Sequence, residues 1–470
     1  DEPDVDNYDA VYLPDNRIIF DSTSTFQGVP CVGGADYVAN LHLMNPDGTH
    51  IRRLCFDQDN DWYPVVMASG RVMYLRWEYT DSAHYFSRVL MSMNPDGTSQ
   101  AAVYHSNSYW PNGMFYARPL PGSPTKFVAI LSGHHGVPRM GELALFDMAK
   151  GRQEDTGALQ RIPGYGKPVQ GIIKDQLVDD SWPKFLHPYP LNDRYFVVSC
   201  KPTPGSAWGI YLVDVFDNML LLKEEPGFAL FEPLPVRKTE RPPVIQDKVK
   251  LSETNATVYM HDVYVGAGLR GVQRGIVKSL RVFQYEYSYR NQGGHYFVGM
   301  EGPWDLRRMI GTVPVEADGS AMFHIPANTP VSLQPLDEEG KALQQMRSWL
   351  VGMPGEYVSC AGCHESQNST AAPTLGLAAR KPAVEPTPWR GPKRGFSFVR
   401  EVQPVLDRYC VGCHNGEPGR PNLSDPKLIS TSAARIPRSY AELHPYLRRN
   451  GPEGDYHTLT PLEFHANTSL

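Results

Sequence analysis

The first 235 residues repeat a pair of strand-like segments, and this repeat limits the fold more than any other feature of the sequence. Each unit has a segment rich in β-branched and aromatic residues, followed by a second apolar segment. The first segments are 17–20, 71–74, 126–129 and 194–197, and the second segments are 41–44, 89–92, 143–146 and 210–213. A tryptophan precedes three of the units, at Trp62, Trp110 and Trp182. Strands that recur with a period of about fifty residues are typical of propeller blades.

The repeat therefore predicts an N-terminal β-propeller over residues 1–235. Two units carry the same turn sequence, Asn-Pro-Asp-Gly-Thr, at 45–49 and 94–98. Proline presets φ and glycine accepts a positive φ, so this sequence favours a tight turn between strands. Four blades are visible, whereas closed propellers have about four to eight. The propeller can thus be incomplete, with blades missing at its N-terminus.

The third unit contains two adjacent histidines, His134 and His135, between Gly133 and Gly136. One interpretation is a solvated loop, because many surface histidines have no chemical role. The other is a metal-binding or catalytic contribution from the propeller face, since imidazole serves as metal ligand and as general acid or base.

Residues 236–246 are basic and contain prolines, which predicts a linker. Residues 247–370 then return to alternating patterns and predict a β-sandwich-like middle domain. A long strand is expected over 275–287. Asp318-Gly319 predicts a hairpin between 313–316 and 321–325, and Glu339-Gly340 is a weaker signal of the same kind.

Two segments with the pattern C-x-x-C-H follow, Cys360 to His364 and Cys410 to His414. This pattern is the signature of covalent attachment of a c-type haem. Two thiols three positions apart can each form a thioether to the porphyrin, and the adjacent histidine can stand under the iron as an axial ligand. The sequence predicts two haems, held by Cys360, Cys363 and His364 and by Cys410, Cys413 and His414.

Zinc and disulfide alternatives remain for the same cysteines. Ribbon-like zinc sites usually separate their cysteine pairs by about 15–20 residues, and Cys363 and Cys410 lie further apart. A thioredoxin-like redox motif needs a βαβ context, which neither segment has. A disulfide within each motif would leave both histidines unexplained. An additional metal ion, zinc or calcium, is a further option for the chain.

Residues 371–395 are rich in Ala, Pro and Arg without periodicity and predict a second linker. Apolar residues between Phe398 and Tyr409 share one helical face, so a helix should lead into Cys410. Pro404 can bend this helix or mark its start. Residues 396–470 therefore predict an α-helical cytochrome c domain. The histidines available as distal ligand are ranked His457 and His465 first, then His444.

Charge and composition exclude some classes of partner. The net charge of −6 argues against a nucleic-acid partner. The sequence has no run of about 18 apolar residues, so it predicts no membrane-spanning segment. The chain begins without Met or a signal peptide, which indicates a processed or trimmed form. Covalent haem attachment implies export to the periplasm or an equivalent compartment. One disulfide is then expected, and Cys31 with Cys55 is the suggested pair.

Nearly the whole chain, from Tyr12 to Leu470, resembles the family related to the alpha subunit of hydrazine synthase, multidomain c-type cytochromes of planctomycete-type bacteria. The segments that carry the resemblance are 133–136, 141–143, 291–296, 315–321, 326–330 and 402–406. The resemblance implies a propeller, a middle domain with one haem and a cytochrome c domain with a second haem. It also implies that the family continues past Leu470 with further histidines.

The sequence departs from the synthase branch at one position. That branch has a tyrosine shortly after the first haem motif as iron ligand, whereas no tyrosine occurs here between His364 and Tyr409. This argues against hydrazine synthesis itself and favours His364 as an ordinary axial ligand. Two functions follow: an exported dihaem oxidoreductase acting on a small substrate at the first haem, or an electron-transfer module whose propeller docks a partner. Either needs a redox partner protein or other subunits.

Overall fold

The computed structural model describes residues 2–30, 33–79, 88–106, 108–136, 139–292, 306–346, 348–363, 365, 367–430 and 435–446. The chain divides into two compact units. The first comprises residues 1–24, 39–78 and 84–248, and the second comprises 25–38, 79–83 and 249–470. Strands dominate, as predicted, and within the ranges given above no helix has the length and hydropathy needed to cross a membrane. The predicted linkers and domain boundaries stay predictions.

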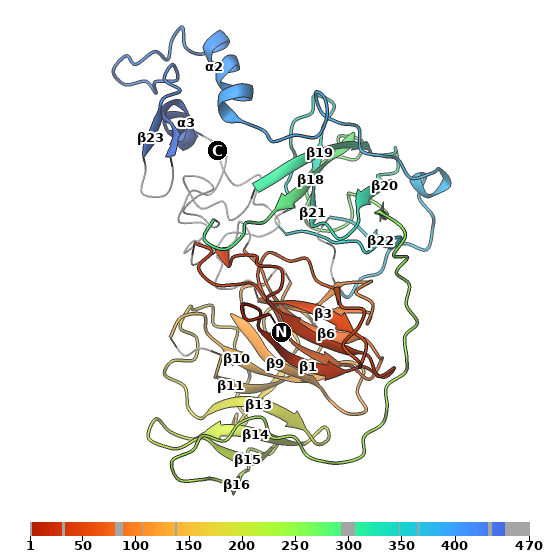
Figure 1. Ribbon diagram of the computed structural model, residues 1–470, viewed down its shortest axis with the longest axis vertical. Helices are drawn as coiled ribbons and strands as arrows, with labels where there is room; N and C mark the ends of the chain where they lie inside the picture. The colour runs from red at the N-terminus through yellow and green to blue at the C-terminus, as the bar shows by residue number, and fades with distance from the viewer. Residues whose placement is uncertain are drawn as a thin grey trace. The chain divides into compact units, whose positions relative to one another are not determined.

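The first unit is built from four sheets, each made of four consecutive antiparallel strands (Figure 1). The strands are β1 (Asn7–Tyr12), β2 (Ile18–Ser22), β3 (Asn40–Met44), β4 (Arg52–Arg53), β5 (Asp61–Val66), β6 (Val72–Trp77), β7 (Arg88–Met93), β8 (Ala101–Tyr104), β9 (Gly113–Pro119), β10 (Lys126–Ser132), β11 (Glu142–Asp147), β12 (Ala158–Ile162), β13 (Lys184–Pro190), β14 (Tyr195–Lys201), β15 (Gly209–Asp214) and β16 (Met219–Lys223). All eight repeated segments form the second and third strands of these sheets. The closed propeller stays a prediction.

The Pro-Asp-Gly turns form as the sequence predicts. The backbone N–H of Asn45 donates to the carbonyl of Thr49 (2.9 Å), and Gly48 has φ of 80°. Asp47 Oδ1 accepts hydrogen bonds from the backbone N–H and the hydroxyl of Thr49. The turn between β7 and β8 repeats this pattern.

The first strand of every sheet contains a β-bulge at the same position. In β1, β5, β9 and β13 the pairing register with the second strand shifts at that position. A non-glycine residue with positive φ stands at each bulge: Asp9 (51°), Tyr63 (58°), Tyr116 (52°) and His187 (46°). A bulge bends the strand and redirects its side chain, and positive φ costs backbone energy for such residues. The four side chains therefore leave their strands with the same local backbone geometry.

Buried apolar side chains fill the spaces between neighbouring sheets of the first unit. Phe127 and Phe146 stack with ring centroids 5.1 Å apart and an interplanar angle of 9°. Trp110 and Tyr104 are completely buried in the same cluster. Trp62 lies in the adjoining cluster, whereas Trp182 is only partly buried. The recurring tryptophans thus differ in their packing roles.

The second unit contains two three-stranded sheets with one shared core (Figure 1). One sheet has the order β20-β17-β22 and the other has the order β19-β18-β21. The strands are β17 (Asn255–Met260), β18 (Ser279–Glu286), β19 (Leu306–Pro314), β20 (Ala321–Pro326), β21 (Val331–Leu336) and β22 (Tyr357–Cys360). Side chains of both sheets, including Val258, Val282 and Phe323, belong to one buried cluster. This part of the chain is therefore mainly β, as predicted, and the sandwich-like haem domain stays a prediction.

The strand connections correct one prediction. The turn at Asp318-Gly319 forms, with Gly319 N–H donating to the carbonyl of Glu316 (2.9 Å), but β19 and β20 belong to different sheets. The predicted hairpin is therefore wrong. Strand β18 already pairs with β19 and β21 on its two edges, and β20 pairs with β17, which buries Phe323 in the shared core.

The described C-terminal part of the second unit contains short helices and a two-stranded sheet, and the predicted cytochrome c domain stays a prediction. Its elements are η3 (Ala378–Arg380), the π-helical η4 (Phe398–Val402), α2 (Gln403–Tyr409), β23 (Leu428–Ser430), β24 (Arg435–Pro437), α3 (Arg438–Leu443) and η5 (His444–Tyr446). Pro404 lies in the first turn of α2, so it marks the start of the regular helix. The Ser439 hydroxyl donates to Gln403 Oε1 (2.6 Å) and joins α3 to α2.

Candidate functional site

The first C-x-x-C-H segment begins at the end of β22. Cys360 is the last residue of this strand and pairs with Met260 of the parallel strand β17. The backbone N–H of His261 donates to the Cys360 carbonyl (2.8 Å), and Gly268 N–H donates to the Cys363 carbonyl (3.1 Å). Backbone hydrogen bonds therefore fix both cysteines, one on each side of the motif.

The two thiols of this segment pack against the core of the second unit. Burial raises the pKa of Cys360 to about 12, and the charge of Glu365 adds to the effect. The pKa of Cys363 is also raised to about 12, first by burial and then by the charge of Cys360. Reactive redox dithiols need a lowered thiol pKa, so this pair is poorly suited to disulfide exchange. An uncharged thioether suits the same environment. His364 lies outside the described residues.

The second segment follows helix α2 directly. The Cys410 amide donates to the carbonyl of Leu406 (2.8 Å), and the His414 amide donates to the Cys410 carbonyl (3.0 Å). The Leu423 amide in turn donates to the His414 carbonyl (2.9 Å). Cys413 is exposed and Cys410 partly buried. Nδ1 of His414 is a buried atom for which the described residues offer no hydrogen-bond partner. A histidine with an unsatisfied ring nitrogen beside two cysteines fits an iron ligand.

Of the three candidate distal ligands, only His444 lies in the described part of the chain. It begins η5 and is 2% exposed. Its ring stacks on Tyr440 with centroids 5.5 Å apart, and Tyr440 contacts Phe398 edge-on at 5.2 Å. His444 is thus part of the apolar contact between α3 and η4. His457 and His465 lie outside the described residues, so their ranking above His444 stays a prediction.

The adjacent histidines of the first unit are held by different partners. His135 Nδ1 lies 2.6 Å from Asp175 Oδ2, and the rings of His134 and His135 are perpendicular with centroids 4.2 Å apart. Arg88 Nη2 hydrogen-bonds His134 Nδ1, and the Arg88 guanidinium lies 3.9 Å from the Trp77 ring centroid. A carboxylate that accepts from Nδ1 leaves Nε2 as the basic nitrogen of a neutral imidazole.

The sequence did not indicate the partners of these histidines. Arg88, Trp77 and Asp175 are distant in the sequence and belong to no motif, so only the fold brings them to His134 and His135. The need for glycine at position 136 is clear from the backbone. Gly136 has φ of 91°, and a Cβ there would lie 2.2 Å from Asp179 Oδ2. His135 is exposed and His134 partly buried, so a solvated loop and a functional pair both stay open for these residues.

The bulged residues of the four sheets form a second polar cluster in the first unit. Tyr63 and Tyr116 have ring centroids 4.3 Å apart, as have Tyr116 and His187. His187 Nε2 lies 3.9 Å from Glu232 Oε1. Burial raises the pKa of Asp9, and the charge of Glu232 raises it further. The contacts therefore run from the two tyrosines through His187 to Glu232, and Asp9 lies near enough for the charge of Glu232 to act on it.

Glu232 extends the repeat beyond the four sheets. It has φ of 53°, like the four bulged residues. Its sequence, Phe231-Glu232-Pro233, matches Trp62-Tyr63-Pro64 in placing an aromatic residue before and a proline after the bulge. This signal for a fifth unit was present in the sequence but was missed.

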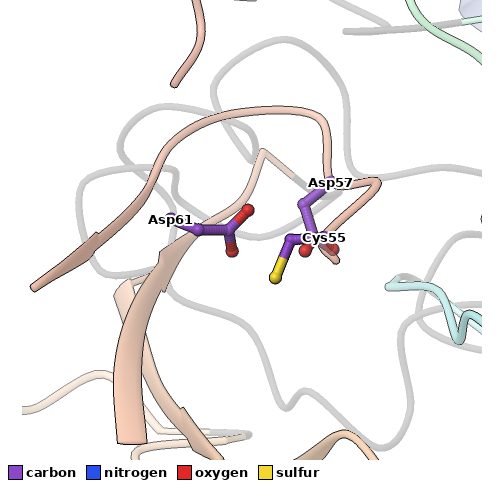
Figure 2. A group of neighbouring side chains, drawn as sticks. All are labelled: Cys55, Asp57 and Asp61. Atoms are coloured by element: carbon purple, nitrogen blue, oxygen red, sulfur yellow. The ribbon is translucent and has the colours of Figure 1, made fainter. Parts of the chain in front are cut away.

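Cys55 corrects the expectation of a disulfide with Cys31. The Cys55 thiol is free and fully buried, and Cys31 lies outside the described residues. Cys55 instead lies beside two buried carboxylates, Asp57 and Asp61 (Figure 2).

The chain is thus a mainly β protein whose sequence carries two C-x-x-C-H segments. A model of the hydrazine synthase alpha subunit middle domain matches residues 275–365, which include the first of the two segments. The structure of hydrazine synthase from Kuenenia stuttgartiensis is similar with a TM-score of 0.68 and 17% identity, covering 91% of this chain and 67% of that chain. The chain thus resembles the hydrazine synthase alpha family, both in its middle domain and in its fold.

Two other solved structures match more weakly. A puromycin hydrolase has 16% identity and a TM-score of 0.22 over 43% of this chain and 27% of its own. An oligogalacturonate lyase in complex with manganese has 14% identity and a TM-score of 0.29 over 74% of this chain and 78% of its own. Both TM-scores are too low to indicate a common fold. No curated protein sequence matches the chain.

Proposed function

We propose that the chain is an exported dihaem c-type cytochrome that acts as an oxidoreductase on a small substrate at its first haem. The second haem would relay electrons to or from a redox partner protein or further subunits. Cys360, Cys363 and His364 would hold one haem, and Cys410, Cys413 and His414 would hold the other. When bound, haem iron supplies one-electron redox chemistry that no side chain provides.

One observation carries this proposal: the domain that matches the hydrazine synthase alpha subunit ends with a C-x-x-C-H segment, at 360–364 within 275–365. The partly buried, uncharged thiols of Cys360 and Cys363 are consistent with thioether formation. The unsatisfied Nδ1 of His414 is consistent with a ligand role at the second segment. Hydrazine synthesis is not part of the proposal, because no tyrosine follows His364 before Tyr409.

The N-terminal sheets would form a closed propeller as part of this proposal. The four sheets carry the same bulge, and contacts link Tyr63, Tyr116 and His187 in series to Glu232 within the first unit. Such a series is expected when the first strands of successive blades surround a common axis. His134 and His135, with Asp175 and Arg88, are the residues of this unit proposed to act on a substrate or metal.

The proposal is tested by counting covalent haems. The full chain is produced in a periplasm that has the cytochrome c maturation machinery, and intact mass gives the number of haems. Wild type should carry two, and Cys360→Ser with Cys363→Ser or Cys410→Ser with Cys413→Ser should each carry one. Cys200→Ser is the control, because Cys200 belongs to neither motif. A wild-type chain with no covalent haem would overturn the proposal.

A second measurement separates catalysis from simple electron transfer. Carbon monoxide is added to the reduced protein and cyanide to the oxidised protein, and the Soret band is followed. Binding at one haem indicates an exchangeable coordination position, as a substrate site requires. Two haems that bind neither ligand would favour the electron-transfer module and contradict the oxidoreductase.

A further inference from the structure

The loop that joins the first two sheets carries three buried metal-binding side chains. Cys55 follows β4, Asp57 lies in the loop, and Asp61 is the first residue of β5. Their donor atoms all lie within 4.8 Å of one another, and the three residues are completely buried. Figure 2 shows the Asp61 carboxylate pointing toward the Cys55 side chain. A thiol and two carboxylates in one dry place are a set of ligands for a divalent cation.

Strand hydrogen bonds fix the backbone on both sides of this loop. The Asp61 amide donates to the carbonyl of Ala39 (3.0 Å), and Arg53 Nε donates to the carbonyl of Cys55 (2.5 Å). Asn40 Nδ2 donates to Asp61 Oδ2 (2.7 Å), and Arg53 Nη2 donates to Asn40 Oδ1 (2.6 Å). Asn40, which is itself held by Arg53, therefore fixes the orientation of the Asp61 carboxylate through Oδ2.

The other oxygen, Asp61 Oδ1, is buried and meets no N–H or hydroxyl donor in the described part of the chain, where its acidic neighbour is the Asp57 carboxyl. A buried acceptor without a partner costs free energy, and a buried carboxylate needs a compensating cation. The Arg76 guanidinium is shared between two other carboxylates, with Nη1 3.5 Å from Asp57 Oδ1 and Nη2 2.6 Å from Glu78 Oε2.

Tyr74 gives an independent indication of an occupant. Its side chain is 1% exposed, it lies in the same buried cluster as Cys55, and its hydroxyl meets no hydrogen-bond partner other than the Cys55 thiol in the described part of the chain. The hydroxyl therefore lies beside the Cys55 thiol, and with Asp61 Oδ1 it is a second buried polar atom at this cluster.

We propose that Cys55 Sγ and the carboxylates of Asp57 and Asp61 bind one zinc ion. Thiolate ligands select zinc over calcium and magnesium, which prefer oxygen donors throughout. Binding releases the thiol proton of Cys55 and any proton on Asp61 to solvent, and no oxidation or reduction takes place. The ion clamps the end of the first sheet to the start of the second. This site is separate from both haem motifs and does not depend on the proposed function.

Zinc analysis of the purified full chain tests the site. After dialysis against a weak chelator, wild type should contain about one equivalent more zinc than Asp61→Asn or Cys55→Ser, measured by inductively coupled plasma mass spectrometry. Asp59→Asn is the matched control, because Asp59 is equally buried in the same loop but accepts from the Asn60 amide (2.6 Å). Equal zinc in wild type and Asp61→Asn would overturn the proposal.

Zinc K-edge absorption identifies the ligands even if a variant fails to fold. Wild type should show one sulfur at about 2.3 Å and oxygens at about 2.0–2.2 Å. Cys55→Ser should lose the sulfur shell, whereas Asp59→Asn should keep it. A wild-type spectrum with only nitrogen and oxygen neighbours, or a protein without zinc, would contradict the site.

Discussion

His187 Nε2 lies 3.9 Å from Glu232 Oε1, which joins the fourth sheet to a segment that belongs to none of the four. Both residues have positive φ at the same position of the repeat. The contact continues the series that passes through Tyr63 and Tyr116. The positive φ of the repeat therefore recurs once more at Glu232, beyond the last strand of the four sheets.

His42, which is buried, and His187, which is partly buried, should make the stability of the first unit depend on pH. Burial lowers the pKa of His187 and of His42 below the usual value of about 6.5. Both are neutral in the folded protein, whereas the unfolded chain takes up a proton at higher pH. Their contribution is therefore complete above about pH 6.5 and is lost as the pH falls through the folded-state pKa values.

Urea denaturation at pH 7.5 and pH 5.5 measures this effect. Replacing His42 and His187 by Gln should reduce the difference in free energy of unfolding between the two pH values. His50→Gln serves as the control, because His50 is exposed. If the double variant loses as much stability at low pH as wild type, other groups are responsible.

The strands of the first unit were predictable because their periodicity is local. Segments such as 126–129 and 143–146 carry their own pattern of β-branched and aromatic residues, and they pair with each other across a short connection. The polar clusters were not predictable, because His135 and Asp175 meet only through the arrangement of separate connections. Sheet membership of β20 also escaped prediction, since a turn sequence specifies a chain reversal and not the strand that becomes the partner.

Phe127 should be among the most sensitive core positions of the first unit. It is 1% exposed and stacks on Phe146, so Phe127→Ala leaves a cavity and should lower the free energy of unfolding by about 3–5 kcal/mol. Phe216→Ala, at a side chain 63% exposed, should change it by less than about 0.5 kcal/mol. Thermal or urea unfolding measures both. Equal effects would show that this stack lies outside the cooperative core.

Gln403 should stabilise the C-terminal helices through two buried hydrogen bonds. Its Nε2 donates to the Leu423 carbonyl (2.8 Å), and its Oε1 accepts from Ser439. Gln403→Leu leaves both partners unsatisfied and should cost about 1–3 kcal/mol, seen as faster amide exchange over 403–446. Val405→Ala, on an exposed position of the same helix, is the control. If a double-mutant cycle shows no coupling energy between Gln403→Leu and Ser439→Ala, the hydrogen bond between these two side chains does not contribute to stability.

The two C-x-x-C-H segments share a glycine at the same position but differ in what surrounds it. A Cβ at Gly362 would lie 2.2 Å from the carbonyl oxygen of Val265, whereas a Cβ at Gly412 would meet nothing within 4 Å. Gly362→Ala should therefore force the loop away from Val265 and cost about 1–3 kcal/mol. Because this loop positions Cys360 and Cys363, the same change should lower haem attachment at the first motif.

Gly412→Ala is the matched variant and should leave both stability and haem attachment close to wild type. Unfolding in urea gives the stability, and mass spectrometry of the peptides that contain each motif gives the haem occupancy. A loss of haem at the first motif in Gly362→Ala alone would link attachment to the packing of this loop on Val265. Equal losses in the two variants would mean that the motif glycine is required by the attachment machinery and not by the fold.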